Sequence, residues 1–188
     1  MTVTSPSPAP GRETPSTGLI YADVPNRVVA YIIDAIIVGI IGAIVGGILG
    51  AIGIRAVTVE GLAFSYNYGA SIIQAIAGLI ISGVYFVYLW THSRATLGMR
   101  ALGLQIGSAG SGATMSTEQA VRRFLLLAGP GILVQVFFPL PVIGLLLPIA
   151  ALAWLVFLLY TTATSPTKQG FHDTLANTQV VKAVKTLV

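Results

Sequence analysis

The chain has 188 residues, of which 55% are hydrophobic and only 9% are charged, and its mean hydropathy is +0.87. Soluble domains carry about 25% charged residues, so this composition excludes an ordinary soluble protein and favours a small bundle embedded in a membrane. The net charge of +4 is spread too thinly over so apolar a chain to suggest nucleic-acid binding. The chain has no cysteine, which excludes disulfides, thiolate chemistry and iron–sulfur ligation.

The start of the chain differs in composition from the rest. Residues 1–18 are rich in Pro, Ser and Thr and nearly free of large apolar side chains. They bury too little apolar surface to offset the entropy lost on ordering, so we predict a disordered tail. Residues 19–182 are predicted to form the transmembrane domain, and residues 183–188 a short C-terminal tail.

The first apolar segment, residues 27–54, contains two charged residues, Arg27 and Asp34. In a helix these two residues share a face, because two turns take about 7.2 residues, but they lie roughly 10 Å apart along the axis. Each must therefore find a partner elsewhere in the chain. A carboxylate inside an apolar span costs about 2.5–3.5 kcal/mol, so we expect a compensating group near Asp34.

The second half of this first span carries small residues at four-residue spacing. In lipid, such rows let two helices approach closely and pack by dispersion. We therefore predict that they contact a neighbouring helix. The rows are Gly39, Ala43, Gly47 and Ala51, and Gly42, Gly46 and Gly50.

The second predicted span covers residues 69–90 and follows a short polar connection at residues 55–68. Gln74 is one of its few polar members. Tyr85 and Trp90 lie near its end, as expected for the aromatic belt at a membrane interface.

A long basic loop follows at residues 91–123. Residues 102–106 and 113–115 can form short strands on either side of the glycine-rich turn at residues 107–112. This pattern predicts a small hairpin within the loop.

Residues 124–160 are apolar throughout, and a single helix of this length would reach about 55 Å, far beyond one bilayer. Pro139 and Pro141 interrupt the segment, so we predict two spans, at residues 122–138 and 142–161. One span followed by a re-entrant or interfacial segment is the alternative.

The distribution of basic residues predicts an orientation. Nine of the ten Lys and Arg residues lie before or at the start of the first span, in the 91–123 loop, or in the C-terminal segment, which leaves only Arg55 on the other side. The positive-inside rule therefore predicts a multi-pass protein of the cell membrane with both termini in the cytoplasm. A strand is predicted near residues 178–181. The expected fold is all-α, a bundle of about four transmembrane helices with a small cytoplasmic loop hairpin.

Three motifs, taken in order, resemble those of the RDD family, small integral membrane proteins named for an arginine and two aspartates. They are RVVAYIID at residues 27–34, TLGMRALGLQI at residues 96–106, and GFHDTLANTQVV at residues 170–181. The resemblance covers residues 21–182. It implies that Arg27, Asp34 and Asp173 are the name-giving residues.

The resemblance also implies a function. Transport, particularly of cations, is suggested for some members of this family. The chain departs from the usual pattern in its long third apolar stretch and in Met99, which stands where a basic residue often precedes Arg100.

Two hypotheses follow for the three name-giving residues. In the first, the protein transports an ion or small solute and Asp34 titrates, because an acid inside a membrane is a functional candidate by default. In the second, the protein is structural or accessory: Arg27 pairs with Asp173, and Asp34 accepts hydrogen bonds from Arg100, Arg122 or a neighbouring hydroxyl. The residues expected to support either role are Arg100, Arg122, Arg123, His172 and Gln74.

Enzyme activity is not expected, because no serine lies in a nucleophile elbow and no HExxH motif is present. His92 and His172 could bind a metal with Asp173 only if folding brought them together, so neither a metal nor a cofactor is predicted. The expected partner is the lipid bilayer, together with further copies of the chain or another membrane protein, since four spans are few for a transporter. No nucleic-acid partner is expected.

Overall fold

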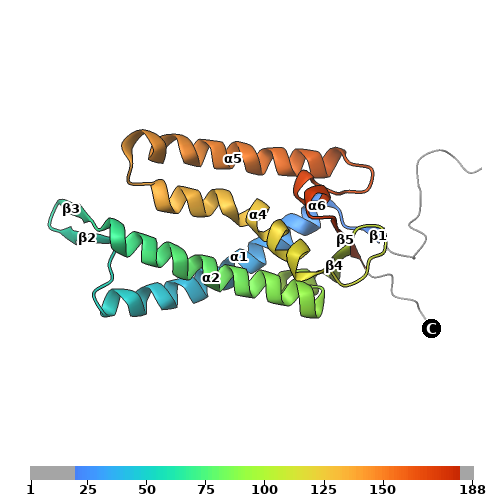
Figure 1. Cartoon of the computed structure of the whole chain (residues 1–188), viewed down its shortest axis with the longest axis horizontal. Coiled ribbons are helices and arrows are strands. Elements are labelled where there is room, and N and C mark those ends of the chain that lie inside the picture. Colours follow the sequence, from blue (N-terminus) through green and yellow to red (C-terminus); the bar gives the residue numbers. More distant parts are fainter. Residues whose placement is uncertain (1–19, 183–188) are drawn as a thin grey trace, which may run out of the picture.

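The computed structural model describes residues 20–182, which form four long helices, two short helices and five short strands (Figure 1). The tails predicted at residues 1–18 and 183–188 lie outside the described residues. The long helices are α1 (Val24–Ala51), α2 (Tyr68–Ser93), α4 (Thr117–Phe137) and α5 (Pro141–Thr164). The short helices are α3 (Leu97–Ala101) and α6 (Phe171–Leu175). The strands are β1 (Ile20–Tyr21), β2 (Val57–Glu60), β3 (Ala63–Tyr66), β4 (Leu104–Ser108) and β5 (Thr178–Lys182).

The four long helices are each long and apolar enough to cross a membrane, which confirms the predicted number of spans. Residues 124–160 contribute to two of them: α4 ends at Phe137 and α5 begins at Pro141, and each helix is long enough to cross, which favours two spans over one span and a re-entrant segment. Pro141 is tolerated at the start of α5 because the first N–H groups of a helix have no partner within it.

The outer surface of the bundle is apolar, as a lipid-facing surface requires. On α1, isoleucines recur every four residues and are 51–59% exposed. They are Ile32, Ile36, Ile40, Ile44 and Ile48.

The helices pack as an open chain rather than as a closed ring. α2 packs against both α1 and α4, and α4 packs against α5, whereas α1 and α5 barely touch. The buried core lies at one end of the bundle, where Phe86 and Trp90 of α2 meet Phe124 of α4. This leaves a space between α1 and the α4–α5 pair.

A three-stranded antiparallel sheet caps the end of the bundle that holds this core, in the order β1-β5-β4. We call it the sheet end. Tyr21 pairs with Val181, and Ile106 pairs with Val180. The strand expected near residues 178–181 is thus confirmed and is the central strand of the sheet.

The hairpin predicted within the 91–123 loop is wrong. β4 pairs with β5, some seventy residues later in the chain, and residues 113–115 form no strand. β5 offers buried apolar side chains such as Val180 and Val181, so pairing with it completes the core, which a local hairpin would not do. The glycine-rich turn instead leads the chain back to α4, which Ser116 begins with a capping box to Gln119.

The opposite end carries the hairpin β2–β3, where a simple polar connection is predicted. We call it the hairpin end. In this half of α1 the predicted close approach at the small residues is not found: a Cβ added at Gly39, Gly42, Gly46 or Gly47 would meet no atom within 4 Å. These glycines therefore leave open space around α1 within the described chain.

Candidate functional site: a buried charge cluster beside a cavity

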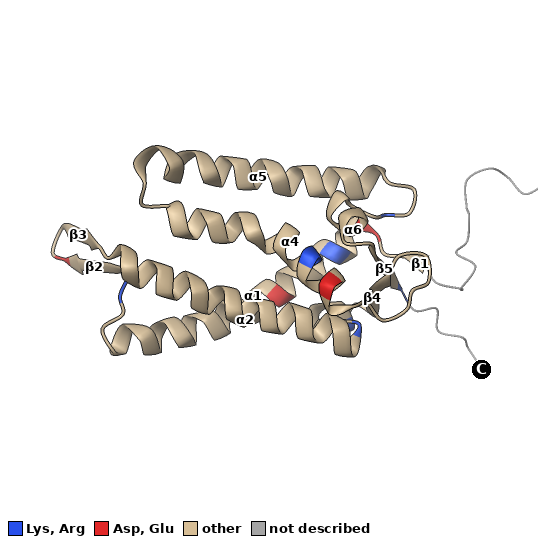
Figure 2. Cartoon of the chain, in the orientation of Figure 1, with Lys and Arg blue, Asp and Glu red and all other residues tan. Residues whose placement is uncertain are grey.

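Basic and acidic positions lie on the helices near the sheet end (Figure 2). Four of these charged side chains are buried or nearly buried. We call Arg27, Asp34, Arg123 and Asp173 the charge cluster. Two are basic and two acidic, so their formal charges cancel. The cluster is divided into two centres, one around each carboxylate.

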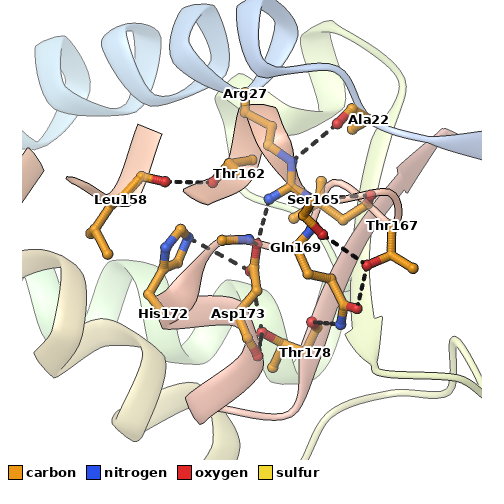
Figure 3. Close-up of polar contacts among 12 residues, drawn as sticks. Ala22, Arg27, Leu158, Thr162, Ser165, Thr167, Gln169, His172, Asp173 and Thr178 are labelled. Carbon is orange, nitrogen blue, oxygen red and sulfur yellow. Dashed lines mark hydrogen bonds and ion pairs between the residues drawn. The ribbon is translucent and has the colours of Figure 1, made fainter. Parts of the chain in front are cut away.

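Asp173 is fully buried, with 0% exposure, and lies in the first turn of α6. Arg27 donates from Nη1 to its Oδ2 over 2.5 Å (Figure 3). Arg123 forms an ion pair with its Oδ1. The backbone N–H of Gly170 also donates to Oδ2, over 3.0 Å. One carboxylate thus joins α1, α4 and α6, and the Arg27–Asp173 pairing expected under the structural hypothesis is present.

Arg27 positions the start of α1 against the sheet. Its Nε donates to the carbonyl of Ala22 over 3.2 Å, and its Nη2 donates to the carbonyl of Val180 over 3.4 Å. Because Val180 lies on β5, the Arg27 side chain links the helix, the central strand and Asp173.

The buried position of Asp173 depends on Gly170. A Cβ at this position would overlap Oγ1 of Thr162 and would lie 2.8 Å from Cε1 of His172. The glycine therefore lets α6 pack directly against the end of α5, which explains the first residue of the GFHD motif.

Arg123 is a buried residue of α4, and Asp173 is its acidic partner. Its Nη1 also donates to Oγ1 of Thr178 over 2.9 Å. The guanidinium lies over the ring of Trp90, with Cζ 5.4 Å from the ring centroid, which adds a cation–π contact. Trp90 is therefore a core residue and not part of an exposed aromatic belt.

His172 lies beside the ion pair of Arg123 and Asp173. Its Nε2 is 3.5 Å from Nη2 of Arg123 and 3.6 Å from Oδ1 of Asp173. Burial, followed by the charges of Arg123 and Arg27, lowers the pKa of His172 to about 2. The imidazole is therefore neutral at physiological pH.

Asp34, 2% exposed, forms the second centre. Its Oδ1 accepts from the hydroxyl of Tyr85 over 2.6 Å and from the backbone N–H of Gly98 over 2.8 Å. Its Oδ2 accepts from the hydroxyl of Thr96 over 2.5 Å. All three donors are neutral, so α1 is joined to α2 and α3 without an ion pair at this carboxylate.

Of the partners predicted for Asp34, the hydroxyl is correct and the arginines are wrong. Arg100 is exposed, and Arg122 is exposed and pairs with Glu118 over 2.7 Å. The sequence predicts Tyr85 only as an interfacial aromatic residue. Nothing in its local sequence indicates that it hydrogen-bonds Asp34, which lies on another helix.

The TLG motif supplies two of the three hydrogen-bond donors to Asp34. Thr96 accepts from the backbone N–H of Met99 as the N-cap of α3 while its hydroxyl donates to Asp34. At Gly98, a Cβ would overlap the carbonyl oxygen of Ala30 and lie 3.0 Å from Cγ of Asp34. Only glycine lets α3 approach α1 closely enough for this hydrogen bond.

A cavity of about 500 Å³ lies between α1 and the α4–α5 pair. Its charged and titratable lining residues lie toward the sheet end, and its remaining wall is mostly apolar. They are Arg27, Tyr31, Asp34, Arg123 and His172. Asp34 therefore borders a cavity and has no arginine in direct contact.

Gln74 does not join the charge cluster. It donates to the carbonyl of Ile54 over 3.0 Å and, with Gln135, lines a separate cavity of about 220 Å³. Similarly, His92 stacks on Tyr88 and lies apart from His172. Across residues 20–182 no group of three His, Cys, Asp or Glu side chains could hold a metal ion.

Comparison with known proteins identifies the family of the chain. The model of the RDD family matches residues 21–177, a range that contains the whole charge cluster. No curated protein and no solved structure matches the chain. With four helices able to cross a bilayer and a family match over most of its length, the chain is a multi-pass membrane protein that belongs to the RDD family.

Proposed function

We propose that the protein transports a cation or another small solute across the cell membrane, and that Asp34 is the residue that binds it. The single observation that carries this proposal is the environment of Asp34: a buried carboxylate on a membrane-spanning helix, beside a cavity, held by neutral donors alone. Such a carboxylate retains the need for a positive partner, which a proton or a bound cation would meet.

The chemistry around Asp34 suits a hard cation. The hydroxyl groups of Tyr85 and Thr96 can rotate, so each can offer an oxygen lone pair as well as a hydrogen. Together with the carboxylate they supply oxygen ligands, which hard cations prefer. A proton and a cation would then compete for one site.

The orientation proposed for this transporter places both termini in the cytoplasm. Among residues 20–182, seven of the eight Lys and Arg residues lie at the sheet end, and only Arg55 lies at the hairpin end (Figure 2). The positive-inside rule supports a cytoplasmic sheet end. We further propose that the role is not enzymatic and that transport requires further copies of the chain or a partner membrane protein.

A structural or accessory role is the second candidate, and one observation favours it. The hydrogen bonds of Asp34 join three helices, and Asp173 is fully enclosed by two arginines, as expected for groups that hold a fold together. In this role, the cluster would fix the helices without binding any solute.

Asp34→Asn distinguishes the two roles, because asparagine keeps the shape of the side chain and removes its charge. The measurement is ion-dependent uptake and internal pH in proteoliposomes, together with the amount of folded protein. The proposal expects a folded variant without transport. Glu60→Gln, at an exposed acid of the hairpin end, is the matched control and should transport normally. If the Asp34 variant is only less abundant and its folded fraction transports normally, the structural role is correct and the transport proposal fails.

A further inference from the structure

Within residues 20–182, three buried side-chain nitrogen atoms lack a hydrogen-bond partner, and all three belong to residues that line the same cavity. They are Nε1 of Trp90, Nε of Arg123 and Nδ1 of His172, the whole set of such buried side-chain nitrogen and oxygen atoms within residues 20–182. Each of the three residues lines the 500 Å³ cavity. A buried donor without an acceptor costs about 1–3 kcal/mol, so three in one wall call for a common acceptor.

At least two of these three nitrogens are donors. Nε1 of Trp90 and Nε of Arg123 can only donate. On His172, Nε2 lies 3.5 Å from Nη2 of Arg123, which can only donate, and 3.6 Å from Oδ1 of Asp173, which can only accept. In the tautomer whose Nε2 accepts from Arg123, Nδ1 carries the hydrogen. Trp90 and Arg123 therefore offer two N–H groups without an acceptor, and His172 offers a third in this tautomer.

The charge at this wall favours an anionic acceptor. Arg27 and Arg123 share a single carboxylate, Asp173, so this centre has one positive charge more than its own contacts neutralise. His172 is neutral and adds no charge to this centre. Asp34, the remaining acid of the charge cluster, is held by neutral groups and forms no ion pair with either arginine.

The rest of the cavity suits an acyl chain. Beyond its polar end it is lined by apolar side chains of α1, α4 and α5, including Ile32, Leu127, Leu155 and Leu158. Its volume lies within the range of about 300–1,000 Å³ that is usual for ligand pockets. Figure 3 shows the imidazole of His172 on the side of α6 that faces Leu158 and Thr162 of α5.

The cavity opens sideways toward the bilayer. Ile32 of α1 and Leu155 of α5 line it and are each about half exposed on the lipid-facing surface. α1 and α5 barely touch, so no helix closes the space between these two residues. A ligand can therefore enter from the membrane with its chain in lipid.

We infer that this cavity is a binding site for an anionic amphiphile, whose carboxylate or phosphate head group accepts hydrogen bonds from Trp90, Arg123 and His172 and whose acyl chain lies between α1 and α5. A fatty acid and an acidic phospholipid share this chemistry. The inference is independent of transport at Asp34.

The two tryptophans of the sequence, Trp90 and Trp154, provide the test, because both line the cavity. The full chain is purified in detergent and titrated with dibromostearate, whose bromine atoms quench tryptophan fluorescence at short range. We expect saturable quenching that oleate reverses and that methyl oleate, which lacks the charge, reverses at least about tenfold less well, a difference of about 1.4 kcal/mol. Native mass spectrometry after adding oleate or phosphatidylglycerol then distinguishes the two sources of the head group.

Two glycines of α4 supply a matched pair of variants. Gly131 lines the cavity and Gly129 does not, and a Cβ at either position meets no atom within 4 Å. Gly131→Leu should fill the cavity and weaken dibromostearate binding about tenfold or more, while Gly129→Leu should bind as the wild type does. Trp90→Phe removes one donor and keeps Trp154 as the reporter, and it should weaken binding about threefold to tenfold.

Three results would overturn the inference: quenching that does not saturate, equal binding by the two glycine variants, or equal competition by oleate and its methyl ester. Circular dichroism and gel filtration establish that each variant is folded before it is titrated. Asp34→Asn removes a negative charge from the cavity wall and should not weaken amphiphile binding, so loss of transport and loss of amphiphile binding are separable outcomes.

Discussion

The backbone N–H of Gly98 donates to Oδ1 of Asp34 over 2.8 Å, and the carbonyl of Ala30 occupies the space that any side chain at residue 98 would need. The hydrogen bond to Asp34 therefore requires glycine at residue 98. The short helix α3 reaches the membrane-buried acid only because its second residue has no Cβ.

This relationship predicts a large effect from a single methyl group. Gly98→Ala should destabilise the protein by about 1–3 kcal/mol or more, because the methyl group overlaps the backbone of α1 and moves the N–H away from Asp34. Thermal unfolding in detergent is the measurement. Gly129→Ala, in an open helical position, is the control and should be neutral or slightly stabilising. Equal melting of the wild type and Gly98→Ala would contradict the steric argument.

The hydroxyl of Tyr85 is expected to stabilise the Asp34 centre. Tyr85→Phe removes one of three hydrogen bonds to a buried carboxylate and should cost about 1.5–3 kcal/mol. In a double-mutant cycle with Asp34→Asn, the two changes should be strongly non-additive. Tyr88→Phe on the same helix is the control, since Tyr88 is exposed. Additive effects of Tyr85→Phe and Asp34→Asn would show that this hydrogen bond contributes nothing.

Removing the charge of Asp173 should lower the stability of the protein more than breaking an ion pair on its surface. Asp173→Asn leaves two arginines without their shared carboxylate and should cost about 3–5 kcal/mol. Glu118→Gln breaks the exposed pair with Arg122 and should cost less than about 1 kcal/mol. The comparison is made by the amount of monodisperse protein after extraction and by its melting temperature. Similar losses in both variants would argue against a central role for Asp173.

Protonation of His172 predicts how stability depends on pH. Its pKa falls from the usual 6.5 to about 2 in the folded protein, so the unfolded chain binds the proton first as the pH is lowered. Folding stability should therefore fall below a pH of about 6.5, by up to about 1.4 kcal/mol per pH unit from this group.

The pH prediction is checked by melting the protein between about pH 7.5 and about pH 5.5, a range above the ordinary titration of carboxylates. His172→Gln should reduce the slope, whereas His92→Gln, at the exposed histidine, should keep it. A slope that is unchanged in His172→Gln would contradict the assignment.

The fold and the site differ in how far the sequence predicts them. Apolar length and the prolines between α4 and α5 are local signals, and they predict the spans. The sequence predicts the pairing of Asp173 with Arg27 but not its pairing with Arg123. Arg122 and Arg123 are adjacent, and only the face of α4 that packs against the core decides which of them is buried.

The partners of Asp34 and of β4 could not be predicted for a different reason. Tyr85 lies 51 residues from Asp34 in sequence, and β5 lies about seventy residues from β4. Such pairings depend on how the helices and strands are brought together in space, and local spacing carries no signal for them. The sequence of the TLG motif does not predict that the hydroxyl of Thr96 and the N–H of Gly98 donate to Asp34.

The central position of β5 has a consequence for the order in which the protein is made. A ribosome releases Arg27 146 residues before Asp173, and β5 emerges after all four long helices. The helices can enter the bilayer one after another, but β1 and β4 have no strand between them until β5 has been synthesised. Arg27 is therefore without its carboxylate partner for most of translation, and the sheet end can assemble only after β5 has been synthesised.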